Sequence, residues 1–436
     1  MRNPRALVIS AIIAGAWGCG QPTEEESDTP GAERVYEVVE SPTYFEHIQP
    51  MMQRHCTGCH TEGAIAPFAL DRPEQVSHVA EFLQHSMQTR LMPPWPPAPG
   101  CGDFQDPRIM LDEELETFER WIEQGKAVGD EDNQVVWQPD GGLPSDEPDL
   151  TLDMGVDYRP VPTSGQTDDY RCFVLDPGLE EDEFVNSLQT RPGNPLLAHH
   201  VIVYVVPETA FGEVETLLAE DERPGYDCFG SPRYAGAQMV AGWVPGTVRQ
   251  PLKEGFGVRI PAGAKLVVQM HYTTVNDREG TDRTEVDLYF VDRQHFSQPK
   301  EIVLLQLAAL DLFIAAGDPD ATATATSPLI PTSLKVHGVV PHMHMLGRRI
   351  RADALTQDGE LCMIDVPNWD FGWQGIYLYR EPVHLQRPFR TRLTCEFDNS
   401  PGNQPAGQSP QDVTWGDESS DEMCLVMFIV ERPDGL

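Results

Sequence analysis

The most specific chemical pattern in the sequence is a pair of cysteines three residues apart, followed directly by a histidine. In the stretch Cys56-Thr57-Gly58-Cys59-His60, two thiols can add to the vinyl groups of a haem while the adjacent imidazole reaches the iron. A Cys-x-x-Cys pair can also bind another metal or act as a redox pair, with the histidine there by chance. The spacing, together with the histidine, favours covalent haem.

Such a haem needs a second axial ligand, usually a methionine some tens of residues further along the chain. Met92, in "RLMPPWPP", stands at that position before a proline. The alternative is a core methionine, in which case Met87 or Met110 would replace it. Locally this stretch resembles the small c-type cytochromes. His55 precedes the motif, has no required role and is expected to be exposed.

A second group of chemically capable residues begins with adjacent histidines. His199 and His200 head the apolar run "LLAHHVIVYVV", which reads as a buried strand. Consecutive strand residues point to opposite faces. Both rings can therefore reach one ion only if the strand is irregular there, or if one ligates through Nδ1 and the other through Nε2. We expect a distortion at the start of the strand.

Three further stretches contain possible ligands. His271 lies in "VVQMHYTT", and His342 and His344 lie two apart in "VVPHMHMLG", so that both would share one strand face. Met423 lies in "DEMCLVMF". Taken singly, a strand histidine is usually a hydrogen-bonded core or surface residue, and a lone methionine is usually packing.

The order of these stretches carries more information. His-His, Gln-x-His-Tyr, His-x-His-x-Leu-Gly and Asp-Glu-Met-Cys, spread over about 150–436, resemble the copper type II, ascorbate-dependent monooxygenases. That family includes peptidylglycine α-hydroxylating monooxygenase and dopamine β-monooxygenase. The resemblance implies two jelly-roll β-sandwich domains, each with one copper, facing one another across a solvent cleft.

The resemblance also implies roles for individual residues. An electron-storing copper would be bound by His199, His200 and His271. The copper where oxygen and substrate react would be bound by His342, His344 and Met423. Three imidazoles suit Cu(II) and Cu(I) alike, whereas a thioether favours Cu(I). Gln269 keeps the family's glutamine before the His271 ligand and would act near the copper or in the electron route. His337 is expected to have a supporting or structural role.

The sequence departs from the family where the peptide-amidating enzyme binds its substrate's carboxylate. Val340, Leu425 and Met427 stand where that enzyme has an arginine, an asparagine and a tyrosine. No cation or hydroxyl remains at these positions, so peptide amidation is not expected. We expect a substrate pocket that is more apolar than that of the peptide-amidating enzyme.

The remaining cysteines suggest disulfides. Nine are present, and six are left once Cys19, Cys56 and Cys59 are assigned to other roles. Six cysteines fit three disulfides, with 15 possible pairings. The resemblance implies Cys395–Cys424 beside Met423 and Cys172–Cys228 in the first sandwich. Cys101 and Cys362 are left by parity, and their pairing would join the cytochrome to the second sandwich.

The N-terminus resembles a bacterial lipoprotein signal. Arg2 and Arg5 precede the apolar "ALVISAIIAGA", which is followed by Cys19 in "AWGC", a candidate for lipidation. Simple cleavage and secretion is the alternative. Either places the protein outside the cytosol, where disulfides persist. We expect a lipid anchor on the outer membrane, facing the periplasm or the cell surface.

Composition restricts the possible partners. The formal charge is −38, from 69 acidic and 31 basic side chains, which argues against nucleic acid or an anionic membrane surface. The expected fold is mostly β, with two jelly-roll-like sandwiches after a small all-α cytochrome c-like domain. The expected segments are a signal peptide (1–19), an acidic tether (20–40), the cytochrome (41–128), a linker (129–149) and the two sandwiches (150–300 and 301–436).

The resulting functional hypothesis is an exported copper monooxygenase that hydroxylates a C–H bond of a small organic substrate with O₂. Its cofactors would be two copper ions and haem c, and its partner an external electron donor, either an ascorbate-like reductant or a redox protein. One alternative is a non-catalytic copper- and haem-binding electron-transfer lipoprotein. Others are an oxidase or peroxygenase at the same site, or a purely structural sandwich protein.

Overall fold

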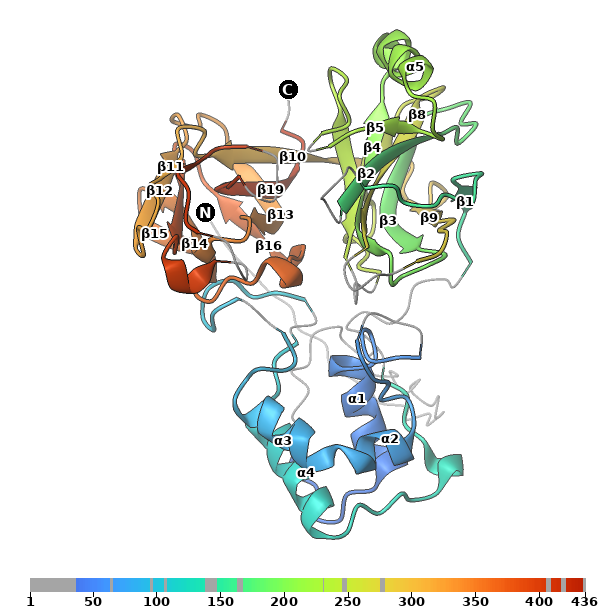
Figure 1. Ribbon diagram of the computed structural model, residues 1–436, viewed down its shortest axis with the longest axis vertical. Helices are drawn as coiled ribbons and strands as arrows, with labels where there is room; N and C mark the ends of the chain where they lie inside the picture. The colour runs from blue at the N-terminus through green and yellow to red at the C-terminus, as the bar shows by residue number, and fades with distance from the viewer. Residues whose placement is uncertain are drawn as a thin grey trace, which may run out of the picture. The chain divides into compact units, whose positions relative to one another are not determined.

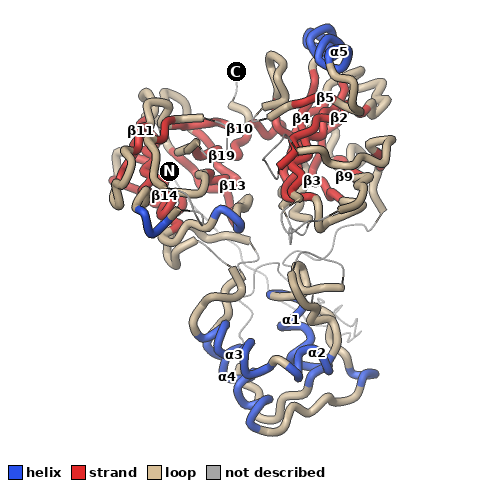
Figure 2. Tube along the Cα trace, viewed as in Figure 1, coloured by secondary structure: helices blue, strands red, loops and turns tan. Residues whose placement is uncertain are grey.

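The computed structural model describes residues 37–433, apart from 63–65, 95–96, 106–107, 138–146, 163–167, 230, 245–248, 275–278, 405–408 and 417–420. The signal peptide, Cys19 and most of the tether lie outside the described residues. Helices occupy the first part of the described chain and strands most of the rest, as Figure 2 shows. The mostly β fold expected from the sequence is confirmed.

The helical segment has a core of its own. Its helices are η1 (Tyr44–Ile48), α1 (Gln49–His55), α2 (Pro73–His78), α3 (Ala80–Gln88), α4 (Asp112–Glu123) and η2 (Glu131–Asn133). Leu111, Leu115, Phe118 and Ile122, at steps of three or four along the chain, predict one apolar face on this helix and the residue before it. In the structure Phe118 and Trp121 are fully buried, whereas Ile122 is only partly buried. The buried face of the helix is therefore centred on Phe118 and Trp121, with Leu115 and Ile122 at its edges.

The next part of the chain forms a pair of packed sheets, which we call the first sandwich. Its elements are β1 (Leu150–Asp153), β2 (Asp168–Leu175), β3 (Glu183–Arg191), β4 (Ala198–Val206), η3 (Glu208–Ala210), α5 (Phe211–Glu220), β5 (Tyr226–Asp227), β6 (Gln238–Trp243), β7 (Phe256–Ile260), β8 (Lys265–Thr273) and β9 (Glu285–Phe290). One sheet has the order β5-β2-β8-β4-β6, and the facing strands are β1-β9-β3-β7 (Figure 1). Alternating strand residues such as Val201, Val203 and Val268 fill the core between the two layers.

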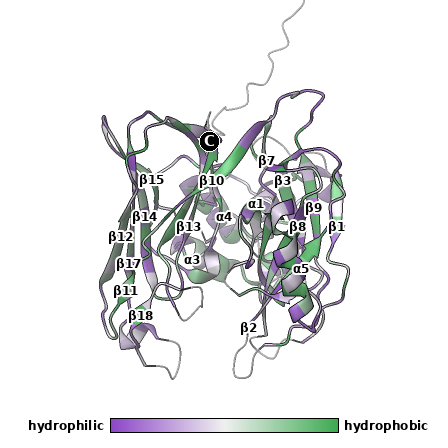
Figure 3. Ribbon diagram, turned by 90° about the horizontal axis from the view of Figure 1, so that it is seen from above, coloured by the Kyte–Doolittle hydropathy of each residue, from purple (hydrophilic) through white to green (hydrophobic). Residues whose placement is uncertain are grey.

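A second pair of layers, the second sandwich, follows. Its elements are β10 (Lys300–Ala308), β11 (Phe313–Ile314), β12 (Ala321–Thr326), β13 (Leu334–His342), β14 (Gly347–Thr356), β15 (Gly359–Val366), η4 (Phe371–Trp373), β16 (Tyr377–Leu385), β17 (Arg390–Phe397), η5 (Pro401–Asn403), β18 (Val413–Thr414) and β19 (Leu425–Glu431). Strands β10-β19-β13-β16 face the sheet β12-β17-β14-β15. Their core contains Ile350, Leu393 and Val430. Hydrophobic stretches, coloured green in Figure 3, lie on strands such as β9 and β10.

The two sandwiches share a sheet. Strands β7 and β10 pair in parallel, with Phe256 opposite Lys300 and Gly257 opposite Glu301, so that one eight-stranded sheet runs through both. A small apolar cluster also joins them, with Val258 of β7 near Ile302 of β10. Sequence patterns gave no sign of this pairing, because a parallel contact of two residues leaves no periodic signature.

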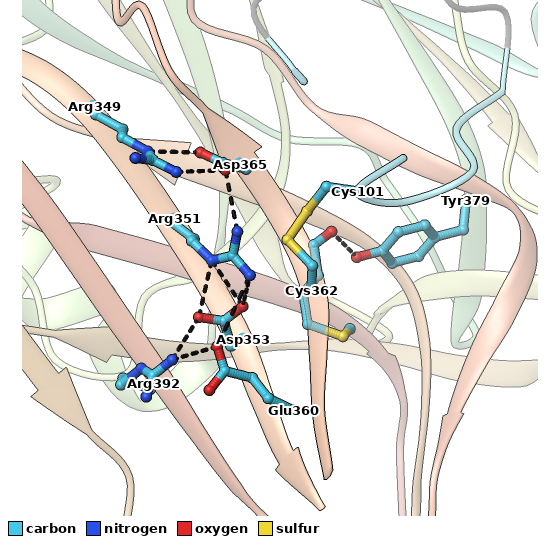
Figure 4. Close-up of a disulfide and its surroundings, with 10 residues drawn as sticks. Cys101, Arg349, Arg351, Asp353, Glu360, Cys362, Asp365, Tyr379 and Arg392 are labelled. Atoms are coloured by element: carbon cyan, nitrogen blue, oxygen red, sulfur yellow. Dashed lines mark hydrogen bonds and ion pairs between the residues drawn. A yellow bond between two sulfur atoms is a disulfide. The ribbon is translucent and has the colours of Figure 1, made fainter. Parts of the chain in front are cut away.

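The segment 98–105 ties the helical part to the second sandwich. Cys101 forms a disulfide with Cys362 of β15, and Phe104 makes an isolated bridge with Tyr379 of β16. The two rings stack at 5.1 Å between centroids. Figure 4 shows the disulfide beside the hydroxyl of Tyr379, which donates to the carbonyl of Met363 at 2.6 Å.

A charged network covers the sheet face near this disulfide, as Figure 4 also shows. Asp353 is almost fully buried and accepts from Arg351 and Arg392, while Arg349 makes a two-pronged contact with Asp365. Such fork-shaped pairs satisfy the buried carboxylates. The Cys172–Cys228 and Cys395–Cys424 disulfides are formed as well, so all three predicted pairings are confirmed. No helix in the described part of the chain is long and apolar enough to cross a membrane.

Candidate metal sites and haem motif

A β-bulge places His199 and His200 on the same side of their sheet. Strand β4 pairs with β8 so that Ala198 lies opposite Tyr272 and His200 lies opposite His271, and the register shifts between these pairs. His199 is the extra residue. A bulge of this kind re-aims one side chain, which is the distortion that the adjacent histidines led us to expect.

The three histidines of this first set converge through the same ring nitrogen. Nδ1 of His200 lies 3.4 Å from Nδ1 of His199 and 3.2 Å from Nδ1 of His271. One ligand atom from each lies within 4.8 Å of the other two. A metal ion between the rings could accept one lone pair from each Nδ1 atom. The geometry therefore fits a three-imidazole metal site.

Strand β2 supports this set from the side. The carboxylate Oδ1 of Asp168 lies 2.8 Å from Nε2 of His271. The ring of Tyr170 stacks on the ring of His271 with centroids 4.1 Å apart. An acceptor on Nε2 fixes the tautomer that leaves Nδ1 free for a metal. Sequence reasoning missed both residues, although "DDYRC" places Asp168, Tyr170 and Cys172 on one strand face.

The electrostatics of the first set favour neutral imidazoles. Burial lowers the pKa of His200 well below its usual value, and nearby His271 and His199 lower it further. Burial also lowers the pKa of His271, although Asp168 opposes this effect. Neutral rings are the form that binds metals.

The second set lies where β13 ends. His342 is the last residue of β13 and His344 lies in the turn beyond it, so the prediction that both occupy one strand is wrong. Their rings nevertheless lie 5.1 Å apart and nearly perpendicular. Nδ1 of His342 lies 2.5 Å from Oε1 of Gln374, and Nδ1 of His344 lies 3.1 Å from the carbonyl oxygen of Asp421. With both Nδ1 atoms engaged, the Nε2 atoms are the candidate ligands.

Glu422 holds Met423 next to His344. Its carboxylate accepts the backbone N–H groups of His344 at 2.9 Å and Met423 at 3.1 Å, as well as that of Leu346. Glu422 is fully buried, and burial raises its pKa to about 7 despite those hydrogen bonds. The Cys395–Cys424 disulfide braces the same turn from β17. These contacts tie the backbone of Met423 to that of His344, and two imidazoles with a thioether are a donor set that suits a soft metal such as Cu(I).

The residues beside His342 are apolar, as the sequence suggested. Val340 lies opposite Met427, and His342 lies opposite Leu425, on the paired strands β13 and β19. Directly opposed residues share a sheet face, as do residues two apart. The three apolar side chains and His342 therefore line one surface.

Two other predicted residues lie in different surroundings. Gln269 is buried, and its Nε2 donates to the carbonyl oxygen of Cys228 at 2.8 Å, so its observed contact is with a disulfide loop. Its catalytic role stays a prediction. His337 is buried against the ring of Phe256, at 4.6 Å between centroids, and burial lowers its pKa to about 4.

The candidate haem motif follows α1 directly. Nδ1 of His60 lies 3.0 Å from the carbonyl oxygen of Phe68, which leaves Nε2 free for a metal. Cys56 and Cys59 form no disulfide. Burial raises the pKa of the Cys56 thiol to about 12 and also raises that of Cys59, so both are uncharged. Two thiols and a neighbouring imidazole fit a covalently bound haem, because each cysteine would add its S–H group across one vinyl group of the haem.

The methionines near this motif differ in burial. Met87 and Met110 belong to the buried core of the helical segment, whereas Met92 is only partly buried and remains available. His55 is not exposed as predicted. Its Nε2 lies 3.2 Å from Oε1 of Glu114 in the core. The prediction failed because nothing near His55 in the sequence indicates a carboxylate that arrives from α4.

Comparisons with known proteins add little. The chain matches no protein-family profile and no curated protein. Among solved structures, PNGF-II is 9% identical with a TM-score of 0.27, and the match covers 66% of each chain, somewhat less than two thirds. An infectious bursal disease virus structure is 11% identical with a TM-score of 0.19, over 65% of this chain and 67% of that one. Likenesses this slight carry no information about function.

Proposed function

We propose that this protein is an exported, copper-dependent monooxygenase similar to the copper type II, ascorbate-dependent family. It would insert one oxygen atom of O₂ into a C–H bond of a small organic substrate. The finer fold proposal is two jelly-roll-like sandwich domains after a cytochrome c-like domain. The three disulfides are compatible with export, and lipidation of Cys19 would provide the anchor.

One observation carries the proposal. The bulge at His199 brings together three Nδ1 atoms from β4 and β8, although an ordinary strand would point adjacent histidines apart. Packing alone does not require a bulge that turns three imidazole Nδ1 atoms toward one another. A bound metal ion would account for the convergence of the three nitrogen atoms.

The two sets differ in donor chemistry, which suggests two roles. Bound copper would supply one-electron redox chemistry at both sets and O₂ reactivity at the second, and haem would supply an entry for electrons. Asp168 would orient His271, and Gln374 would orient His342. The buried Glu422 would hold Met423 against His344. The apolar face of Val340, Leu425 and Met427 favours substrates without a carboxylate.

The alternative is an electron-transfer lipoprotein that holds copper and haem without oxygen chemistry. The two functions predict the same metals and differ in oxygen consumption. Substrate-independent reduction of copper with no O₂ uptake would favour the alternative. Turnover driven by peroxide without a reductant would indicate a peroxygenase.

Metal stoichiometry tests the proposal first. The full chain, loaded with copper and haem and then desalted, should contain about two coppers per haem. His342→Ala should lower the ratio to about one, whereas His295→Ala, which changes an exposed histidine paired with Asp292, should leave it at two. A wild-type protein that retains no copper would contradict the proposal.

A further inference from the structure

A short turn between β15 and β16 contacts both histidine sets. The ring of Phe371, in η4, lies 6.0 Å from the ring of His199 and is nearly parallel to it. The same ring lies 5.9 Å from the ring of His344, edge to face. His199 belongs to the first sandwich and His344 to the second. Phe371 therefore lies against one imidazole of each set.

The turn is fixed by polar contacts on the side of the second set. Nε2 of Gln374 donates to the carbonyl of Phe371 at 3.1 Å, while Oε1 of the same side chain lies 2.5 Å from Nδ1 of His342. Nε1 of Trp369 donates to the carbonyl of His344 at 3.1 Å. These bonds hold the backbone on both sides of Phe371 to the histidines of the second set. The position of its ring is therefore coupled to theirs.

The chemistry of the Phe371 side chain suits a spacer rather than a ligand. Its ring is planar, rigid and apolar, and it has no donor atom that could bind a metal ion. Because it contacts both His199 and His344, it can limit how closely those two imidazoles approach each other.

We propose that Phe371 is a positioning residue that holds the two metal sites at one fixed separation. The inference rests on the proposed function, since it assumes an ion at each set. It adds that the spacing is set by a ring contact with His199 and His344, rather than left to the relative motion of the sandwiches. Offset and edge-to-face ring contacts of this kind are individually weak compared with the stability of a domain. The contact can therefore restrict motion without deciding whether the protein folds.

The test is the distance between two bound Cu(II) ions, measured by pulsed dipolar EPR on the copper-loaded full chain. Wild type should give one narrow distance distribution. Phe371→Ala should keep two coppers but lose that narrow component, giving a broadened or shifted distribution. Phe371→Tyr, which keeps the ring, should restore it. Phe313→Ala removes an exposed ring from β11 of the second sandwich and should behave as wild type.

The outcomes separate this inference from the function on which it rests. Fewer than two coppers in wild type would overturn the proposed function. Two coppers in both proteins, with the same distance distribution in Phe371→Ala as in wild type, would overturn the role of Phe371 alone. Loss of one copper from Phe371→Ala would also overturn it, because the proposal holds that each set is complete without the ring.

Discussion

Nε2 of His271 lies 2.8 Å from the carboxylate oxygen Oδ1 of Asp168, and its other ring nitrogen faces the histidines of β4. The carboxylate is half-exposed and the imidazole is buried. The contact with Asp168 favours the His271 tautomer that carries its proton on Nε2. Nδ1 is then left as the donor at the first set.

Asp168→Ala should weaken copper binding at the first set by about 10–100-fold, because removing the hydrogen-bond partner of a metal-binding histidine typically lowers metal affinity by that factor. The affinity of the second set should not change. Competition with a copper chelator would measure both. Asp292→Ala removes the carboxylate from an exposed Asp–His pair, Asp292 with His295, and should change neither affinity. An unchanged affinity in Asp168→Ala would mean that the carboxylate does not orient His271.

The sequence allowed some of this site to be predicted because adjacency imposes geometry. Two neighbouring histidines at the head of a strand cannot serve one ion without an irregularity, and the bulge at His199 is that irregularity. The pairing of Cys101 with Cys362 followed by parity only after the family resemblance had implied the other two disulfides. The bulge was therefore predictable from backbone geometry alone, whereas the disulfide also needed the resemblance.

The missed contacts depend on tertiary placement. Gln374 reaches His342 from a turn 32 residues further along the chain, and Glu114 reaches His55 across 59 residues. Neither residue belongs to a motif. The placement of His344 beyond β13 was also missed, because alternation in "HMH" suits a strand and a turn equally well.

The buried contact of Glu114 should matter to the helical segment. Glu114 accepts from Arg54 at 3.3 Å and from the backbone N–H of Leu111 at 2.9 Å, besides its contact with His55. Glu114→Ala should lower the free energy of unfolding by about 2–4 kcal/mol, because it leaves buried partners unpaired. Glu116→Ala, which removes a more exposed pair with Arg120 on the same helix, should cost at most about 0.5 kcal/mol. Helical circular dichroism during thermal unfolding would compare them, and equal losses would contradict the buried role.

The buried imidazole of His337 should make stability sensitive to acid. Burial lowers its pKa in the folded protein to about 4, whereas the unfolded chain should titrate near the ordinary value of about 6.5. As the pH falls from 6.5 to 4, the unfolded state takes up the proton first, so the folded state loses stability on the order of 3 kcal/mol. Above pH 6.5 the imidazole of His337 is neutral in both states and adds no pH dependence to the stability.

His337→Leu should flatten the stability of the protein between pH 6.5 and 4, relative to wild type. Urea unfolding at several pH values would measure the difference between the two proteins. His384→Gln changes an exposed histidine and should leave the wild-type profile intact. Parallel profiles for wild type and His337→Leu would show that the imidazole titrates normally in the folded state.

The disulfide between Cys101 and Cys362 should hold the segment that follows Met92 on the second sandwich. It joins residues separated by 261 positions, and removing a native disulfide typically costs about 2–5 kcal/mol. Cys101→Ala/Cys362→Ala should therefore lower stability and free the segment 98–105, although the Phe104–Tyr379 bridge would still favour docking. Trypsin cleavage after Arg108, near that segment, should become faster under native conditions. Cys172→Ala/Cys228→Ala removes a disulfide from the first sandwich instead, and should lower stability while Arg108 stays as protected as in wild type. If both double variants are cleaved there at the same rate, the disulfide contributes only general stability and does not fix the helical segment in place.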